Sequence, residues 1–337
     1  MRNDTRLKFN AYMAAIQQLN GVPDATKKFA VTPSVQQKLE TRIQESSAFL
    51  QKVNMVIVDE QSGEKLGLGV NSTIAGTTDT SLKDREPTDP TDLVGNRYEC
   101  TQTNFDTALR YTKIDTWAKF PDFQTRIRDV LVKQQALDRI MIGWNGTSRA
   151  ATSNRATNPL LQDVNKGWLQ KYREDAAARV MKQGATANQI RVGVAAGHDY
   201  VNLDALVMDA ASNLIAPQFR DDTELVVICN QTLLDDKYFP LVNREQPNSE
   251  MTAADVIMSQ KRIGGRAAVA VPYFPEGALL ITRLDNLSIY IQDGARRRSV
   301  QDNPKRDRVE NYESSNDAYV IESYEGGCFV ENIKLTW

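Results

Sequence analysis

The sequence is poor in the residues that build covalent or metal-bound frameworks. It has three cysteines, Cys100, Cys229 and Cys328, which lie far apart and form no Cys-x-x-Cys pair. It has a single histidine, His198. We therefore expect neither a disulfide scaffold nor a zinc site, and a reducing cytoplasm is the natural setting.

Long apolar runs are absent as well. No stretch approaches the ~20 apolar residues that are needed to cross a bilayer. The first thirty residues carry Arg2, Asp4, Arg6 and Lys8 and lack the apolar run of a secretion signal. The sequence therefore predicts a soluble protein that is not secreted and has no membrane partner.

Neither sign of charge is in excess, because 41 basic and 43 acidic residues give a net charge of −2. A dedicated nucleic-acid binder normally has a strongly basic domain, so that class ranks third among the alternatives. At 337 residues the chain can form two or three domains and bury enough apolar surface to fold without disulfides or metals.

Little in the sequence indicates catalysis. Asp199 follows His198 and could orient it as a general base, but no recognisable nucleophile motif accompanies the pair. Gly264 and Gly265 lack the Walker A lysine of a phosphate loop. We expect no enzyme, no cofactor and no metal; a cytoplasmic hydrolase or transferase without a recognisable motif is the alternative.

What the sequence does contain is a set of strands and opposed charges near its C-terminus. Residues 279–290 and 307–314 have the composition of strands, and from Leu287 onward apolar and polar residues alternate. Residues 296–308 contain six basic and two acidic residues, whereas residues 309–327 contain five acidic and no basic residues. Opposed charge blocks of this kind suit a surface that contacts copies of the same chain.

The N-terminal half predicts two helices, an arm and a further long helix. Apolar residues at helical spacing predict a helix that ends at Asn20-Gly21, and Thr32-Pro33 begins a second one. Residues 60–97 are rich in glycine, threonine and aspartate and have little apolar periodicity. Because residues 53–58 and 105–112 on either side have the pattern of strands, we interpret the insertion as the tip of a long two-stranded arm.

The longest helical pattern begins at Pro121 and ends at Asn145-Gly146. Its apolar face is predicted to contain Phe123, Ile127, Val130, Leu131, Leu137 and Met141. Gln135 and Arg139 are assigned to its polar faces. Beyond residue 195 the patterns are typical of a compact α/β domain, with helices at 200–215, 231–237 and 252–259 and strands at 225–229 and 267–271.

Six short segments identify a family. They lie in collinear order at residues 8–12, 44–47, 167–173, 203–210, 255–264 and 271–275, from Lys-Phe-Asn-Ala-Tyr to Val-Pro-Tyr-Phe-Pro. In these segments the sequence resembles the major capsid protein of peduovirus-type tailed bacteriophages. The resemblance implies an α+β fold of the Hong Kong 97 type, with an N-terminal arm, an extended hairpin arm, a peripheral domain with a long spine helix, and an axial domain.

The same resemblance implies boundaries and a function. The expected parts are a propeptide at 1–29, an N-terminal arm at 30–58, the hairpin arm at 59–116, a peripheral domain at 117–194 and 293–337, and an axial domain at 195–292. Hexamers and pentamers would form an icosahedral head around double-stranded DNA. Maturation would cleave between Phe29 and Ala30 and rearrange the shell.

Partners and contact residues follow as expectations. The partners are other copies of the chain, a scaffolding protein, a maturation protease, the portal protein and nonspecifically bound DNA, with assembly in the host cytoplasm and a final place in the virion capsid. Arg126 and Arg128 are candidates for contact with DNA on the inner surface. The candidates for contact between subunits are Lys65, Lys83, Arg85, Glu86, Arg296, Arg297, Arg298, Arg308, Glu310 and Glu313.

Overall fold

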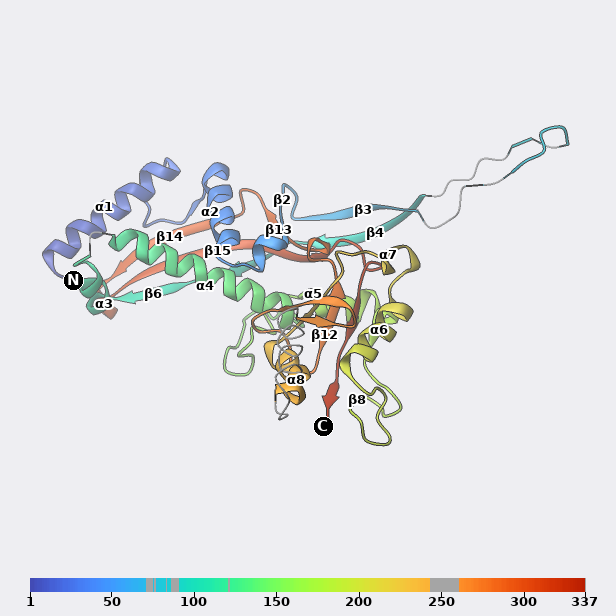
Figure 1. Cartoon of the computed structure of the whole chain (residues 1–337). Helices are drawn as coiled ribbons and strands as arrows, with labels where there is room; N and C mark the ends of the chain where they lie inside the picture. The colour runs from blue at the N-terminus through green and yellow to red at the C-terminus, as the bar shows by residue number, and fades with distance from the viewer. Residues whose placement is uncertain are drawn as a thin grey trace.

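The computed structural model of the chain describes residues 1–70, 75, 77–82, 84–85, 91–120, 122–242 and 261–336. Figure 1 shows an elongated molecule in which the longest helix lies along a sheet and a narrow hairpin extends away from the body. The predicted helix at 252–259 lies outside the described residues.

The helices follow the expected order along the chain. The predicted end of the first helix at Asn20 and the predicted start of the second at Thr32-Pro33 are confirmed. The αL conformation of Gly21 closes the first helix as a glycine C-cap does. The α-helices are α1 (Asn3–Asn20), α2 (Pro33–Glu45), α3 (Tyr111–Trp117), α4 (Phe123–Asn145), α5 (Trp168–Asp175), α6 (Leu203–Leu214), α7 (Pro217–Arg220) and α8 (Gln231–Val242).

The strands form two larger sheets and two pairs. They are β1 (Phe29–Ala30), β2 (Asn54–Val58), β3 (Ser62–Val70), β4 (Thr91–Glu99), β5 (Thr101–Asn104), β6 (Thr107–Arg110), β7 (Val180–Met181), β8 (Ile190–Val192), β9 (Val226–Cys229), β10 (Arg262–Ile263), β11 (Arg266–Ala270), β12 (Leu279–Thr282), β13 (Leu287–Gln292), β14 (Arg297–Asn303), β15 (Arg308–Ile321), β16 (Cys328–Val330) and β17 (Ile333–Leu335).

A seven-stranded sheet is built around β15, the longest strand. Its path is β1-β14-β15-β13-β2. β14 and β13 pair one after the other along one edge of β15, and β6 and β5 pair along its opposite edge. The β14–β15 pair is a hairpin in which Arg298 lies opposite Glu313 and Asn303 opposite Arg308. Within the hairpin, Arg298 of the basic block thus lies directly opposite Glu313 of the acidic block.

A six-stranded sheet forms the second half of the molecule. Its order is β10-β11-β9-β12-β16-β7, and apolar residues of α6 and α8 pack with it in a separate core cluster. The chain passes from this sheet to the seven-stranded one between β12 and β13, and it returns with β16. The expected boundary at residue 292 therefore lies after β13, a strand of the seven-stranded sheet.

The hairpin arm differs from its prediction in two respects. Residues 60–97 were expected to be a tip without regular structure, but β3 and β4 pair from Ser62↔Glu99 to Val70↔Thr91. The strand predicted at 105–112 is not part of the arm, because β6 pairs with β15. The arm is a two-stranded sheet that has no other strand beside it among the described residues.

The long helix α4 is confirmed, but its buried face is not the predicted one. Val130 is exposed, whereas Val132, Ala136 and Ile140 are buried. Gln135 is 6% exposed and Arg139 fully buried, so their assignment to polar outer faces was wrong. The helix is rotated from the predicted orientation because its polar residues have partners in the sheet.

Aromatic residues join α4 to the rest of the main core. The rings of Trp144 and Trp168 are 4.8 Å apart, and Phe274 lies 4.9 Å from Trp144. The Trp168 Nε1 atom donates to the Ser288 carbonyl at 3.0 Å. Gly143 allows this packing, because a Cβ atom there would lie 2.3 Å from the Trp168 ring.

We predict that Gly143→Ala lowers the free energy of unfolding by about 1 to 3 kcal/mol, the usual cost of overpacking a core. Alanine in place of glycine within a helix ordinarily stabilises by about 1 kcal/mol, so helix propensity predicts the opposite sign. Urea denaturation measures the difference. The exposed Ser212→Ala variant is the control, and a stabilised Gly143→Ala variant would contradict the packing described above.

Candidate functional site

The most unusual cluster of side chains in the molecule is a buried network of charges. It joins the second helix, α2, the long helix α4 and the β14–β15 hairpin. All of its charged members are at most 5% exposed. They are Glu40, Arg139, Arg296, Glu313 and Asp317, with the amide of Gln135 beside them.

Arg139 occupies the centre of this network. Its Nε atom donates to Asp317 Oδ2 at 3.1 Å, and its Nη1 atom binds Glu40 Oε2. A further donation at 3.3 Å reaches the Ser315 hydroxyl. One guanidinium thus holds the sheet, the long helix and α2 together through bonds of the strong, charge-assisted kind.

Arg296 makes a second set of contacts. Its Nη2 atom donates to Glu313 Oε1 at 2.6 Å and to Gln135 Oε1 at 2.7 Å, while its Nη1 atom binds Glu40 Oε1. Gln135 in turn donates to Glu313 Oε2 at 3.0 Å. The two oxygens of Glu40 are therefore shared between two arginines.

Burial and the guanidinium groups act in opposite directions on the carboxylates. Burial alone would raise the pKa of Glu313, but Arg296 and Arg298 outweigh it and lower that pKa to about 2. The pKa of Glu40 is likewise lowered by Arg139 and Arg296 against the effect of burial. Burial raises the pKa of Asp317, and the nearby charge of Glu40 adds to this effect.

This arrangement corrects part of the predicted contact set. Arg296 and Glu313 were expected to contact a neighbouring subunit, which is wrong for this conformation, because both side chains are buried and bound to each other. Glu310 is 7% exposed and pairs with Arg308 at 2.6 Å within the chain. Most of the acidic block is thus neutralised internally.

The other charged candidates have different surroundings. Arg298 donates to Asn311 Oδ1 at 2.9 Å and to the Tyr12 hydroxyl at 2.8 Å, so it joins α1 to the sheet. Arg297, its neighbour on the opposite face of β14, is exposed. Of Arg296, Arg297 and Arg298, only Arg297 has an exposed side chain.

The arm candidates are only partly described. Arg85 is exposed, and Lys65 lies in β3, opposite Asn96 of β4. Lys83 and Glu86 lie outside the described residues. The contacts predicted for these four residues remain predictions.

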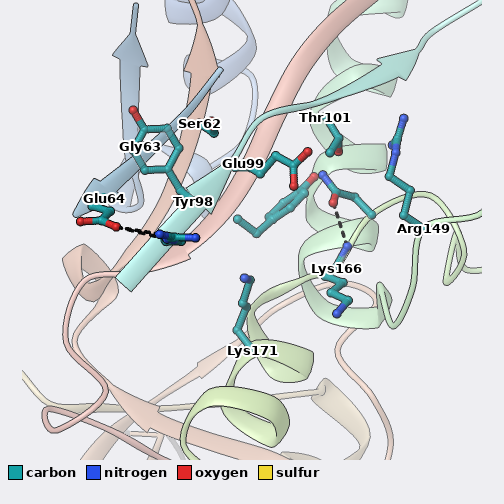
Figure 2. Close-up of a pocket in the computed structure, with 13 residues that line it drawn as sticks. Ser62, Gly63, Glu64, Tyr98, Glu99, Thr101, Arg149, Lys166 and Lys171 are labelled. Carbon is teal, nitrogen blue, oxygen red and sulfur yellow. Dashed lines mark hydrogen bonds and ion pairs between the residues drawn. The ribbon is translucent and has the colours of Figure 1, made fainter. Parts of the chain in front are cut away.

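A cavity of about 800 Å³ lies where the arm meets the body (Figure 2). Its walls carry Arg97, Arg149, Lys166 and Lys171, together with Glu64 and Glu99. Arg97 pairs with Glu64 at 3.1 Å, and Lys166 pairs with Glu174 at 2.8 Å. The hydroxyl groups of Ser62, Thr101 and Tyr319 belong to the same lining.

The predicted cleavage position lies on the edge of the seven-stranded sheet. Phe29 and Ala30 form β1 and pair with Arg298 and Arg297 of β14. The Phe29 side chain is buried, whereas Ala30 is exposed. The segment before it packs α1 against α3 and the hairpin through Phe9 and Ile16 in a small core of its own.

The two arginines predicted to face DNA are held by local contacts. Arg126 pairs with Asp122 at 2.7 Å and lies over the ring of Phe120, 4.7 Å from its centre. Arg128 pairs with Asp129 at 2.9 Å. Both belong to the N-terminal part of α4, and their contact with DNA remains a prediction.

Nothing around His198 forms a catalytic arrangement. Its Nδ1 atom lies 2.5 Å from the Ala195 carbonyl, and its Nε2 atom contacts the Thr336 hydroxyl. Asp199 accepts from the backbone of Ala185 and Arg191, so it does not orient the imidazole. Burial raises the pKa of the Cys229 thiol to about 12, which makes it a poor nucleophile.

The described part of the chain also lacks the features of a metal site and of a membrane span. No group of three or more histidine, cysteine or carboxylate residues there is arranged to hold a metal ion. No helix there has both the length and the apolar character needed to cross a membrane.

Sequence reasoning missed most of the network. Four of its members were not identified from the sequence: Glu40, Gln135, Arg139 and Asp317. Each lies in a segment that also has an exposed polar face, so a polar residue there does not reveal that it is buried. One signal was present: Gln135 and Arg139 are four positions apart and follow the same helical stripe as Val132 and Ala136. Their partners Glu313 and Asp317, however, each lie 178 positions away in the sequence.

Comparisons with known proteins agree with one another. Residues 8–333 match the model of a family described as phage major capsid protein, P2 family. The chain is 55% identical to the capsid protein of Escherichia phage P2, over 99% of this chain and 96% of that protein. It is 40% identical to the major capsid protein of Serratia phage KSP20, over 99% of this chain and 97% of that protein.

Solved structures show the same likeness. A chain of the satellite phage P4 procapsid, in a structure that includes the size determination protein Sid, superposes with a TM-score of 0.82 at 53% identity, covering 100% of this chain and 99% of that one. The capsid of the native GTA particle has a TM-score of 0.53 at 13% identity, covering 86% of this chain and 91% of that one, which shows the shared fold alone.

We predict that Arg296→Met lowers the free energy of unfolding by about 3 to 5 kcal/mol, because it leaves Glu40 and Glu313 buried without one of their cations. The matched control is Arg297→Met, one residue away on the exposed face, which should change stability by less than about 0.5 kcal/mol. Denaturant unfolding of the unassembled subunit measures both. Equal effects of the two substitutions would contradict the role assigned to the network.

Proposed function

Since the chain belongs to the P2 family of phage major capsid proteins, we propose that its hairpin arm binds a neighbouring subunit and so joins the subunits of the shell. The chain is a structural component of an icosahedral phage capsid with the Hong Kong 97-type fold, and it is not an enzyme. Its function therefore lies in surfaces that associate with other copies of itself.

The observation that carries the proposal is the isolation of the arm. In the part of the chain that the structure describes, β3 and β4 pair only with each other, and Figure 1 shows them leaving the body of the molecule. A two-stranded hairpin is marginally stable in water unless its strands or faces pack on something else. A neighbouring subunit is the support that a shell supplies at every position, and many such weak contacts together give a stable container.

The parts of the subunit have corresponding proposed roles. The seven-stranded sheet with α4 would form the peripheral domain, and the six-stranded sheet with α6 would form the axial domain. The helices support this division, since α6 and α8 pack with the six-stranded sheet in a cluster of their own, whereas α4 packs in the main cluster. The main cluster also contains Ile228, Leu280 and Phe329 of the six-stranded sheet, so it joins the two parts. Six or five copies would then associate into hexamers and pentamers of the shell.

The N-terminal segment would act before maturation. Residues 1–29 carry five basic and two acidic residues, and α1 is held to the body by its own small core and by the Arg298–Tyr12 hydrogen bond. Cleavage between Phe29 and Ala30 would allow these contacts to be lost together. The uncleaved conformation would then lose their stabilisation, and a rearranged shell would be favoured. That position is exposed at Ala30 and lies on a sheet edge, which a protease can peel away.

The remaining partners complete this proposal. A scaffolding protein, a maturation protease and a portal protein would act during assembly in the host cytoplasm, and the finished shell would enclose double-stranded DNA. The P4 procapsid structure includes the size determination protein Sid, which supports an accessory protein of the scaffolding kind for this chain too.

Shortening the arm tests the proposal. Residues 64–97 are replaced by Asn-Gly, a turn that joins the paired residues Gly63 and Tyr98. No described residue of 64–97 belongs to the three larger core clusters, and Tyr98, which packs on Tyr290, is retained. The melting temperature of the unassembled subunit should therefore change by less than about 4 °C, the shift expected for 1 kcal/mol or so.

Particles are the decisive readout. The shortened chain should give no closed shells in electron micrographs when it is expressed under conditions in which the full chain forms them. Shells of normal size and stability from the shortened chain would refute the role of the arm, and a subunit that melts far below the full chain would show that the arm supports its own body instead.

A further inference from the structure

The segment that carries the proposed cleavage position is paired to the body as a strand. We call the bond between Phe29 and Ala30 the scissile bond; it lies within β1, which pairs with β14. Before β1, the Ala25 carbonyl accepts from the Val300 amide at 3.0 Å. After it, the Val31 amide donates to the Arg296 carbonyl at 2.9 Å. The backbone on both sides of the scissile bond is therefore hydrogen-bonded to one edge of β14.

Side chains of this segment are buried in a core that α1 completes. Ala25 is fully buried, Val31 is 4% exposed, and Phe29, whose carbonyl group a protease would attack, is 9% exposed. All three belong to the same small cluster as Phe9 and Ile16 of α1. We name α1 together with residues 25–31 the latch, because the two parts share one core.

Polar contacts hold the latch to the strand on which it lies. Arg298 of β14 donates to the Tyr12 hydroxyl at 2.8 Å, and Asp302 of β14 pairs with Arg6. Figure 1 shows α1 at the end of the molecule that lies opposite the arm. The helix thus binds the same strand, β14, that pairs with the segment around the scissile bond.

The core beneath the latch is incompletely filled. A cavity of about 40 Å³ remains there, lined by Phe9 and Tyr12 of α1 and by Ile127, Leu131 and Val309 of the body, among others. Atoms that face a void lose part of their dispersion contacts, so this small core is held less firmly than a fully packed one. The buried charge network and the tryptophan-rich core do not depend on it, so the latch can detach while the body stays folded.

A closed latch does not fit a protease. A bound peptide is extended, pairs its backbone with the binding site as an added strand does, and places alternate side chains in pockets. Here β14 already occupies the backbone groups of Ala25 and Val31, and the side chain of Phe29 lies in the core. The segment must therefore leave β14 before a protease can bind it.

We propose that the latch is autoinhibitory: the scissile bond can be cut only after α1 and residues 25–31 have detached from β14. Hydrolysis then adds water across the amide and leaves a carboxylate on Phe29 and an amino group on Ala30. Because α1 is no longer joined to the chain, the latch cannot close again. This inference rests on the cleavage position in the proposed function and assigns the step that controls it.

Chymotrypsin tests the latch on the unassembled full-length subunit, because it cuts after aromatic residues and so attacks the same bond without the maturation protease. Phe9→Ala removes a buried ring of the latch and should speed the release of the fragment that begins at Ala30 by about tenfold or more, since proteolysis follows the population of the opened form. Mass spectrometry of the products at low protease concentration measures the initial rate.

The matched control lies on the opposite face of the same helix. Leu7 is exposed, so Leu7→Ala should leave the rate within about twofold of that of the unsubstituted chain. If Phe9→Ala does not fold, Tyr12→Phe gives the same comparison with a smaller increase, because it removes only the hydroxyl group that binds Arg298.

Hydrogen exchange distinguishes local opening from unfolding of the whole subunit. The Val300 amide is bonded to the latch, so Phe9→Ala should raise its exchange rate by the same factor as the cleavage rate. The amides of β13, whose Leu287, Ile289 and Ile291 belong to the main core, should keep their exchange rates.

Three results would overturn the latch. The first is a scissile bond that is cut in the unsubstituted subunit as fast as in a free peptide of residues 20–40. The second is an equal cleavage rate with and without Phe9→Ala. The third is an equal rise in the exchange of β13, which would assign cleavage to global unfolding. If the latch behaves as expected but mature shells retain residues 1–29, the latch stands and the proposed maturation cleavage fails.

Discussion

The structure depends on one constraint: two arginines and three carboxylates are buried together, so each carboxylate requires a guanidinium beside it. An unpaired ion in such a place would cost several kcal/mol, so each charged group requires its partners to be in position. Glu40 comes from α2, Arg139 from α4, and Glu313 and Asp317 from β15. None of these elements can move independently of the others, because moving one would leave charges of the other two without partners.

This constraint explains why the subunit combines a rigid body with an unsupported arm. The network and the tryptophan-rich core fix the seven-stranded sheet against α4. Among the described residues, β3 and β4 pair only with each other, and they pack on this sheet at their base, where Tyr98 contacts Tyr290. The rigid part then presents its edge strands and its first helix, α1, in fixed positions. Binding energy for a shell is gained at such surfaces, and a pre-organised body loses little conformational entropy when it associates.

The sequence predicted those helices whose limits depend on neighbouring residues. The end of α1 at Gly21 and the helix of α4 followed from glycine, proline and apolar spacing. β3 and β4 were missed because glycine and threonine interrupt the apolar alternation, and pairing depends on a register between segments that are far apart. The rotation of α4 was missed because Arg139 finds Asp317 178 positions away, and no window of neighbouring residues contains that information. The predicted interface at Arg296 and Glu313 failed for the same reason, since opposite charges in sequence pair first within the hairpin that they form.

The central claim is that the arm gains its stability from a neighbouring subunit while the body is stable alone. Hydrogen–deuterium exchange of the unassembled subunit and of the assembled shell compares the two parts directly. The account predicts that the amides of β3 and β4 exchange rapidly in the subunit and become protected in the shell, whereas those of β14 and β15 are protected in both. Protection of β3 and β4 in the free subunit, or rapid exchange of both strands in the shell, would contradict it.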